Sequence, residues 1–169
     1  MGVETERKFL VELPNLCTIL KLDGAVVCEI TQTYLVPSDA ERRIRMIICG
    51  GEVSYIYTEK RNVPGSSFSR FEDEREITLD EYQKLYREAI SQLKKTRYAF
   101  PYAGHVVEID VYPDDIGGEL LRGRAILEVE MDSEGETILL PEFIHVISEV
   151  TGCKDYSNKK LAIKIKTGE

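Results

Sequence analysis

Two glutamates and a lysine occupy alternate positions near the N-terminus, at Glu4, Glu6 and Lys8, ahead of an apolar run. Successive side chains of a β-strand point to opposite faces, so a strand here would present all three on one face. Such a face could lie in water at the edge of a sheet, or it could bind ligands. Carboxylates favour hard cations such as Mg²⁺ or Mn²⁺, and lysine binds phosphate oxygens. The second interpretation predicts chemistry on a phosphate compound.

The same alternation of charged residues recurs in most other strand-like segments. In each segment the charged residues on one face are as follows, segment by segment: Glu41, Arg43 and Arg45; Lys60; Arg70, Glu72, Glu74 and Glu76; Lys95 and Arg97; Glu108 and Asp110; Glu128 and Glu130. Acids cluster on some strands and bases on others, which a folded protein tolerates best beside a counter-charge or a bound ion. An ordinary half-buried sheet with its polar face in water is the alternative.

Turn signals and strand-like segments predict an α+β fold with about eight antiparallel strands. The segments lie at residues 3–12, 26–36, 41–49, 53–61, 69–78, 95–100, 105–112 and 124–131. Gly50 and Gly51 predict a tight hairpin. Closing the strands into an eight-stranded antiparallel β-barrel, with helices packed on the outside, would turn the charged face inward as a ligand site. Because no linker or repeat divides the chain, we expect one domain over residues 1–169.

Three helical segments are expected between and after these strands. Thr78 and Glu81 fit a capping box, and apolar residues continue at helical spacing as far as Leu93. A second helix is predicted from Pro141, with Gly152 as its stop. A short helical turn is expected over residues 14–21.

Composition narrows the function classes. The net charge of -8 argues against general binding to nucleic acid. No apolar run is long enough to span a bilayer, and no signal peptide is apparent, so we expect a cytoplasmic protein. The cysteines at 17, 28, 49 and 153 are widely spaced, which indicates reduced structural thiols. His105 and His145 lie in unrelated segments and do not suggest a catalytic triad or a multi-histidine metal site.

The remaining candidates for chemistry are therefore carboxylates, lysines and arginines. Arginine and lysine hold phosphate groups, and Mg²⁺ or Mn²⁺ bridges carboxylates to phosphate oxygens. The GxxxxGK[ST] and GxGxxG loops that commonly bind phosphates are absent. Metal-assisted chemistry on a polyphosphate is the reaction class that this inventory favours.

Taken in order, the motifs resemble those of the CYTH superfamily, also called triphosphate tunnel metalloenzymes. The matches are ExExK at Glu4, Glu6 and Lys8, QxYL from Gln32 to Leu35, RxR at Arg43 and Arg45, Lys60 in TEK, RxExE from Arg70, KxR at Lys95 and Arg97, ExDxY at Glu108, Asp110 and Tyr112, ExE at Glu128 and Glu130, and YSNxxLA from Tyr156 to Ala162. They cover nearly the whole chain.

The resemblance implies an eight-stranded tunnel that binds a triphosphate compound and a divalent metal, Mg²⁺ or Mn²⁺. It assigns the triphosphate to Lys8, Arg43, Arg45, Lys60, Lys95 and Arg97, with Lys159 or Lys160 closing one tunnel mouth. It assigns metal binding to Glu4, Glu6, Glu128 and Glu130. Glu74 and Glu76 would bind a second metal or orient the attacking water.

Metal-dependent hydrolysis of inorganic tripolyphosphate is the leading hypothesis, because the short chain leaves little protein outside the barrel for a nucleoside pocket. An adenylate cyclase that makes cyclic AMP from ATP is the alternative within the same fold. A thiamine triphosphatase and a non-catalytic polyphosphate or nucleotide sensor stay open. An apolar patch on the outside of the barrel could also pair two chains into a homodimer.

Overall fold

The structure is a computed structural model that describes residues 2–66 and 69–165. Its strands are β1 (Gly2–Glu12), β2 (Val26–Leu35), β3 (Glu41–Cys49), β4 (Glu52–Asn62), β5 (Ser69–Glu76), β6 (Ala89–Tyr102), β7 (His105–Val111), β8 (Arg124–Glu130), β9 (Val146–Glu149) and β10 (Ile163–Lys164). Its helices are α1 (Leu16–Ile19), α2 (Leu79–Tyr86) and α3 (Asn158–Leu161), with 3-10 turns η1 (Gly118–Leu120) and η2 (Lys154–Tyr156).

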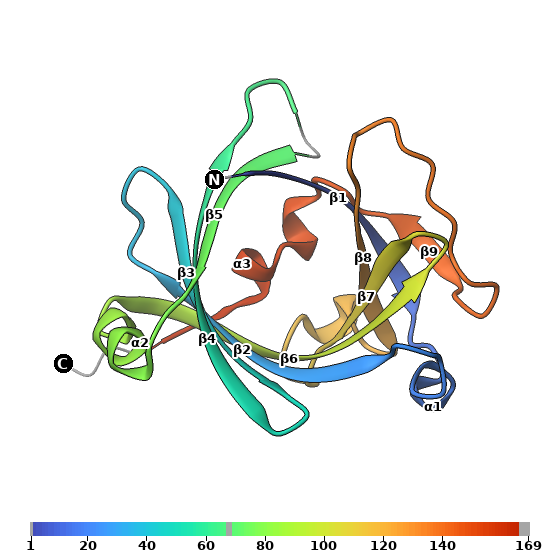
Figure 1. Ribbon diagram of the computed structural model, residues 1–169, viewed down its shortest axis with the longest axis horizontal. Coiled ribbons are helices and arrows are strands. Elements are labelled where there is room, and N and C mark those ends of the chain that lie inside the picture. Colours follow the sequence, from blue (N-terminus) through green and yellow to red (C-terminus); the bar gives the residue numbers. More distant parts are fainter. Residues whose placement is uncertain (1, 67–68, 166–169) are drawn as a thin grey trace.

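Eight of these strands close into an antiparallel barrel (Figure 1). Their order around the barrel is β6, β2, β3, β4, β5, β1, β8 and β7, and β7 pairs with β6 to complete the circle. The predicted hairpin is present, since Cys49 pairs with Glu52 and the two glycines between them adopt φ values of 58° and 86°. Positive φ at both central residues suits the twist of a two-residue hairpin. The predicted fold class is confirmed.

Alternation along the strands gives the barrel wall two different faces. The outward positions of β1, β6, β7 and β8 form the largest apolar cluster, whose buried members are Phe9, Val11, Ile19, Phe100, Val107, Ile109, Ala125, Leu127, Val129 and Ile144. Arg7 also faces outward, where it donates to both oxygens of Glu149 at 2.8 Å. Because neighbouring residues alternate, burying this outer row turns the charged row toward the lumen.

The three helices do not all lie on the outside as expected. Ile19 of α1 packs in the outer apolar cluster, and Tyr82 and Leu85 of α2 pack against a smaller outer cluster around Ile44. By contrast, α3 lies within the outline of the barrel (Figure 1). Its residue Leu161 packs with Leu10, which lies on the lumen side of β1. The C-terminal segment therefore supplies part of the interior.

One part of the lumen is filled by apolar side chains. Leu10, Leu93 and Ile126 occupy the next inward positions beyond Lys8, Lys95 and Glu128, Tyr34 follows Gln32 on β2, and all four apolar side chains are buried. They pack with residues from the loop before β8 and from the C-terminal segment, namely Ile116, Leu121, Val150 and Leu161. The charged cavity is consequently bounded on this side by a second core.

The helix predicted from Pro141 to Gly152 is wrong. This segment instead forms an irregular turn and then β9, which pairs with β1. β5 pairs with β1 only as far as Thr5, so β1 has a free edge at Phe9 to Val11 that β9 occupies. Ile144 and Val150 pack in different apolar clusters, which one straight helical face could not achieve.

The predicted helix after Thr78 is present but shorter than its apolar pattern suggested. The Thr78 hydroxyl accepts a hydrogen bond from the Glu81 backbone N–H at 3.2 Å, as the capping box predicted. The helix ends at Tyr86, and Ile90 and Leu93 belong to β6, where burial alternates from residue to residue. In the part of the chain that the structure describes, no helix is long and apolar enough to cross a membrane.

The cysteines also differ from expectation. Cys28 of β2 and Cys49 of β3 form a disulfide, with their Cα atoms 4.4 Å apart, whereas the sequence predicted reduced thiols. The spacing of the two residues in sequence gave no sign of the pair, because only the register of β2 against β3 brings them together. Cys17 and Cys153 are free and exposed.

The outer apolar cluster should carry much of the stability of the barrel. Leu127→Ala removes a fully buried side chain from it, and we expect the free energy of unfolding to fall by about 2 to 5 kcal/mol. Denaturant titration measures this change. Leu139→Ala is the matched control, since that side chain is 62% exposed and its loss should change the free energy by less than about 0.5 kcal/mol. Equal effects of the two variants would contradict this assignment of the core.

Candidate functional site

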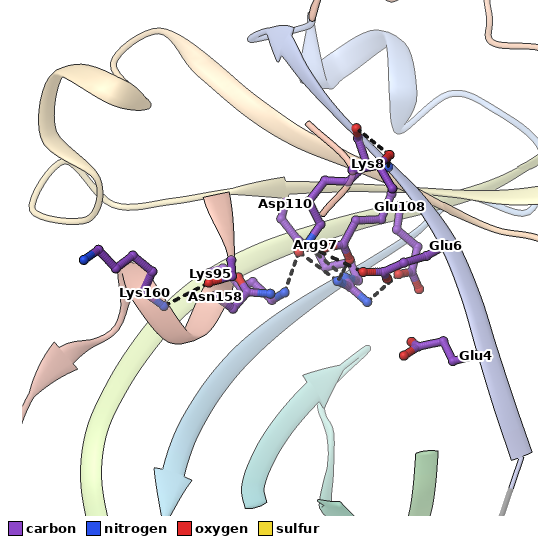
Figure 2. Close-up of polar contacts among 12 residues, drawn as sticks. Glu4, Glu6, Lys8, Lys95, Arg97, Glu108, Asp110, Asn158 and Lys160 are labelled. Atoms are coloured by element: carbon purple, nitrogen blue, oxygen red, sulfur yellow. Dashed lines mark hydrogen bonds and ion pairs between the residues drawn. The ribbon is translucent and has the colours of Figure 1, made fainter. Parts of the chain in front are cut away.

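A cavity of about 910 Å³ lies inside the barrel and is lined by ten basic and eight acidic side chains. Thirteen residues to which the sequence assigned roles line it: Glu4, Glu6, Lys8, Arg43, Arg45, Lys60, Glu74, Lys95, Arg97, Glu128, Glu130 and both alternatives for the tunnel mouth, Lys159 and Lys160. Figure 2 shows Glu4, Glu6 and Lys8 of β1 directed to the same side as Lys95 and Arg97 of β6. The structure therefore brings together residues that lie far apart in the sequence, such as Glu4 and Lys159.

Glu76 is the exception among the predicted site residues. It shares a face with Glu74, but it does not line the cavity and is exposed at the end of β5, opposite Ile56. Strands of a closed barrel tilt relative to its axis, so successive inward positions on one strand run out of the cavity. The two glutamates therefore occupy different surroundings.

A network of buried charges links four strands on one side of the cavity. Asp110 of β7 accepts from Lys95 at 2.5 Å and from Arg97 Nε at 2.7 Å. Arg97 also donates to Glu128 of β8 at 2.9 Å, and Lys8 of β1 contacts the other Glu128 oxygen at 2.9 Å. Glu108 contacts the remaining Arg97 nitrogen at 2.5 Å, and Figure 2 shows Arg97 close to both Asp110 and Glu108. Each of these cations is thus held in place by an anion.

The protonation states in this network follow from competition between burial and pairing. Burial disfavours the ionised form of Glu128, but Lys8 and then Arg97 outweigh it and hold its pKa well below the usual range. Asp110 behaves alike, since Arg97 and Lys95 lower its pKa despite complete burial. For Lys95, burial outweighs pairing. Burial and then repulsion from Arg97 lower its pKa to about 8, and Asp110 offsets this only in part.

A second set of ion pairs occupies the other side of the cavity. Lys60, which is 7% exposed, lies between Glu4 and Glu72 and contacts Glu72 at 2.6 Å. Arg45 contacts Glu74 at 2.6 Å, and that carboxylate also accepts from the Thr58 hydroxyl at 3.1 Å. A third carboxylate joins two walls, since Glu41 contacts Arg70 at 3.5 Å and Lys159 at 3.3 Å. This last pair ties the C-terminal segment to β3.

Arg43 is half-buried and differs from the cations described above because it has no ion pair among the residues that the structure describes. Its Nε atom is buried without a hydrogen-bond partner. The nearby hydroxyl of Tyr34 accepts from Gln32 Nε2 at 2.6 Å. Burial and then repulsion from Arg43 lower the pKa of Arg45 to about 10, which shows that positive charge accumulates here. A half-buried guanidinium that lines the cavity without an ion pair fits an anionic ligand.

The carboxylates at Glu4, Glu6 and Glu130 have the chemistry of a hard-metal site. Burial, then Glu128, raise the pKa of Glu6, while burial, then Glu4, raise that of Glu130. Crowded oxygen donors that repel one another gain from a divalent cation. Glu128 fits less well, because Lys8 and Arg97 occupy its two oxygens. Within residues 2–66 and 69–165, no three acidic, histidine or cysteine side chains are already spaced to hold an ion.

Sequence reasoning assigned no role to three acids that organise the site. Asp110 holds two cations, Glu72 pairs with Lys60, and Glu41 joins β3 to the C-terminal segment. All three occupy the alternate positions that carry the charged residues of their strands, and this position was the sign of their role in the sequence. Their partners could not be read from parity alone, because the partner depends on which strands are neighbours.

Several solved structures share this fold. The crystal structure of the inorganic triphosphatase NE1496 is 27% identical and has a TM-score of 0.55, with 96% of this chain and 99% of that chain covered. The PH1819 protein from Pyrococcus horikoshii OT3 is 20% identical, at a TM-score of 0.55, with 82% and 80% covered. A putative adenylate cyclase from Vibrio parahaemolyticus is 14% identical, at a TM-score of 0.51, with 79% of each chain covered.

No protein-family model and no curated protein sequence matches this chain. The two likenesses below 25% identity concern the fold alone. The barrel, the order of its motifs and the structural neighbours are together consistent with the CYTH, or triphosphate tunnel, superfamily that the sequence resembles.

Lys95 makes the site sensitive to pH. Because its pKa is lowered to about 8, its positive charge is lost as pH rises through that value, and we expect affinity for tripolyphosphate to fall between pH 7 and 9. Calorimetric titration at a series of pH values measures the affinity. Lys95→Arg is the control, because arginine stays charged over this pH range. Protonation of tripolyphosphate itself affects both proteins equally, so the difference between their pH profiles reports the charge of Lys95. Parallel pH profiles would contradict the prediction.

Proposed function

We propose that the protein hydrolyses a linear triphosphate, with inorganic tripolyphosphate as the preferred substrate, and that the reaction requires Mg²⁺ or Mn²⁺. The observation that carries this proposal is Arg43, which lines the cavity with a buried, unpartnered Nε atom and has no ion pair in the described part of the chain, whereas the cations around it are held by carboxylates. A polyanion supplies the charge that Arg43 lacks and can replace several carboxylates at once. The printed name of the neighbour NE1496, an inorganic triphosphatase, supports the same class of substrate.

Binding would begin with the exchange of internal partners for phosphate oxygens. Arg45, Lys60 and Lys8 each contact a glutamate that also lines the cavity, so these pairs can open toward a ligand. Lys95 and Arg97 are anchored from behind by Asp110, which does not line the cavity. Those two cations would therefore keep their positions while the others turn to the substrate. Lys159 would add charge from the C-terminal side.

The reaction needs little covalent help from the protein. Phosphoryl transfer depends mainly on positioning and on stabilising charge on the transferred group. A water oxygen would form a bond to the terminal phosphorus as the bridging P–O bond breaks, which releases orthophosphate and pyrophosphate. Glu74, held by Arg45 and Thr58, is our candidate for orienting that water. Glu76, which the resemblance pairs with it, lies outside the cavity wall.

Glu4, Glu6 and Glu130 are the residues that we propose hold the metal, with Glu128 joining only if it releases a cation. When bound, a divalent ion supplies charge that polarises the phosphate oxygens. The chain's own contribution is to present oxygen donors on one wall and cations on the others. Lys8 lies between these groups, 3.6 Å from Glu6 and 2.9 Å from Glu128.

The cavity wall favours an inorganic substrate over a nucleotide. Tyr34 is the only aromatic residue that lines it in the described structure, and that ring is 3% exposed. A base or a thiamine ring usually gains binding energy from stacking on exposed aromatic faces or from an apolar pocket. Here the wall offers almost only charged and hydroxyl groups.

A substrate panel tests the proposed activity. With Mg²⁺ or Mn²⁺, we expect orthophosphate and pyrophosphate from tripolyphosphate at a higher kcat/KM than any product from ATP or thiamine triphosphate, and we expect EDTA to abolish turnover. Chromatography with product identification measures each reaction. Cyclic AMP from ATP would establish the cyclase instead. Tight binding of tripolyphosphate without any product would show a sensor.

Substitution of Glu6 tests the metal assignment. Glu6→Gln keeps the shape but removes a carboxylate, so we expect metal-dependent turnover to fall by about 100-fold or more, with Glu4→Gln acting in the same direction. Metal-free binding of tripolyphosphate should be retained, because a negative charge is lost from the cavity. Glu52→Gln, at the exposed β3–β4 hairpin, is the control that should leave turnover unchanged. Full activity of Glu6→Gln would overturn the assignment.

A further inference from the structure

The disulfide between Cys28 and Cys49 lies at one end of a regular ladder. The two residues are directly opposite in the register of β2 and β3, and six further pairs follow from Glu29–Ile48 to Tyr34–Arg43. Their Cα separation of 4.4 Å is close to the ~4.5 Å of an ordinary non-hydrogen-bonded antiparallel pair. The bridge therefore adds no displacement of the backbone. Both the disulfide and two thiols fit the same barrel.

Both cysteines are also within reach of small reagents. Each is half-buried, and the β3–β4 hairpin that follows Cys49 turns at two exposed glycines. Disulfides in reducing compartments are usually transient or regulatory, whereas permanent ones belong to oxidising compartments. A pair that is accessible and that can open without unfolding fits the first group.

The bridge ties β3, which carries two arginines of the cavity, to β2, whose other neighbour β6 carries a third. Cys49 shares the inward face of β3 with Arg45 and Arg43. On its other side, β2 places Cys28 directly opposite Arg97 of β6. Neither cysteine lines the cavity, so the pair would act on these arginines through the strands.

Repulsion among the three arginines gives the connection between the disulfide and the cavity an effect on their positions. After burial, Arg43 and Arg97 are among the groups that lower the pKa of Arg45, although Glu74 opposes them. Like charges that are held close favour any movement that separates their strands. A covalent bond between β2 and β3 resists this movement at the end of the ladder, where strands fray most readily. The bond thereby keeps the arginines in place for an anion.

We propose that Cys28 and Cys49 form a redox-active pair, and that the disulfide form binds triphosphate more tightly than the dithiol form because it fixes the position of β3 and its Arg45. This inference rests on the proposed function, since triphosphate is its ligand. It names a regulatory site in the wall of the barrel that is distinct from the residues that contact substrate.

The exchange reaction requires a dithiol reductant or glutathione. A thiolate of the reductant attacks one sulfur and breaks the Cys28–Cys49 bond, forming a mixed disulfide and releasing the other cysteine as a thiolate. A second thiol resolves the mixed disulfide, so that the reductant leaves oxidised and the protein gains two electrons and two protons. Glutathione disulfide reverses these steps.

Alkylation and mass spectrometry test whether the pair exchanges in the folded protein. The chain has four cysteines, so we expect four alkylated thiols after treatment with dithiothreitol and two after glutathione disulfide, with Cys28 and Cys49 protected in the second case. Circular dichroism should be the same for both forms. Cys17→Ser is the control that removes one free thiol without changing the exchange. A bond that opens only when the barrel unfolds would overturn the proposal.

Calorimetry of metal-free tripolyphosphate binding tests the effect on the site. We expect about three- to tenfold tighter binding to the disulfide form, because preorganised groups lose less freedom on binding. The Cys28→Ser/Cys49→Ser variant should bind like the dithiol form whatever the redox buffer, and the reduced wild-type protein gives the same comparison if that variant fails to fold. Equal affinity of the two wild-type forms would overturn this inference alone. No binding to either form would overturn the proposed function as well.

Discussion

Charge pairing inside the barrel is the constraint on which the rest of the structure depends. An ionised side chain cannot be buried without a partner of opposite charge or several hydrogen bonds. The lumen meets this condition with carboxylates that come from different strands than the cations they hold, as when Asp110 of β7 fixes Lys95 and Arg97 of β6. The cations are therefore positioned before a ligand arrives. Among the described residues, only Arg43 combines a buried Nε atom that lacks a hydrogen-bond partner with the absence of an ion pair.

The two faces of each strand divide the work of stability and function. The outer face of β1 contributes Phe9 and Val11 to the main apolar cluster, while Glu4, Glu6 and Lys8 line the cavity. Burial of the apolar row drives closure of the barrel. Closure removes water from around the inner charges, which strengthens the electrostatic interactions between them. An isolated strand with the same residues would leave these charges in water, where they interact only weakly.

Alternation was sufficient to predict the charged lumen, because its period of two matches a strand and no other regular structure. It could not reveal positions that depend on neighbours. Glu76 has the right parity but leaves the cavity through strand tilt. Helical spacing also misled at Phe143, Ile144, Ile147 and Val150, because residues of their segment pair with the open edge of β1 and form β9. The disulfide likewise follows from register, to which widely spaced cysteines give no clue.

The pairing of β1 has a consequence for how this chain can change in length. β1 is hydrogen-bonded to β5 and β9 along one edge and to β8 along the other. Inserting or deleting a single residue within it would invert the side chains beyond that point, which would bring Phe9 and Val11 into the cavity and expel Lys8. A β-bulge at a strand end could absorb such a change, but the middle of β1 could not. Insertions are therefore better tolerated in exposed connections such as the turn at Gly50 and Gly51, where a longer loop leaves the alternation of both strands unchanged.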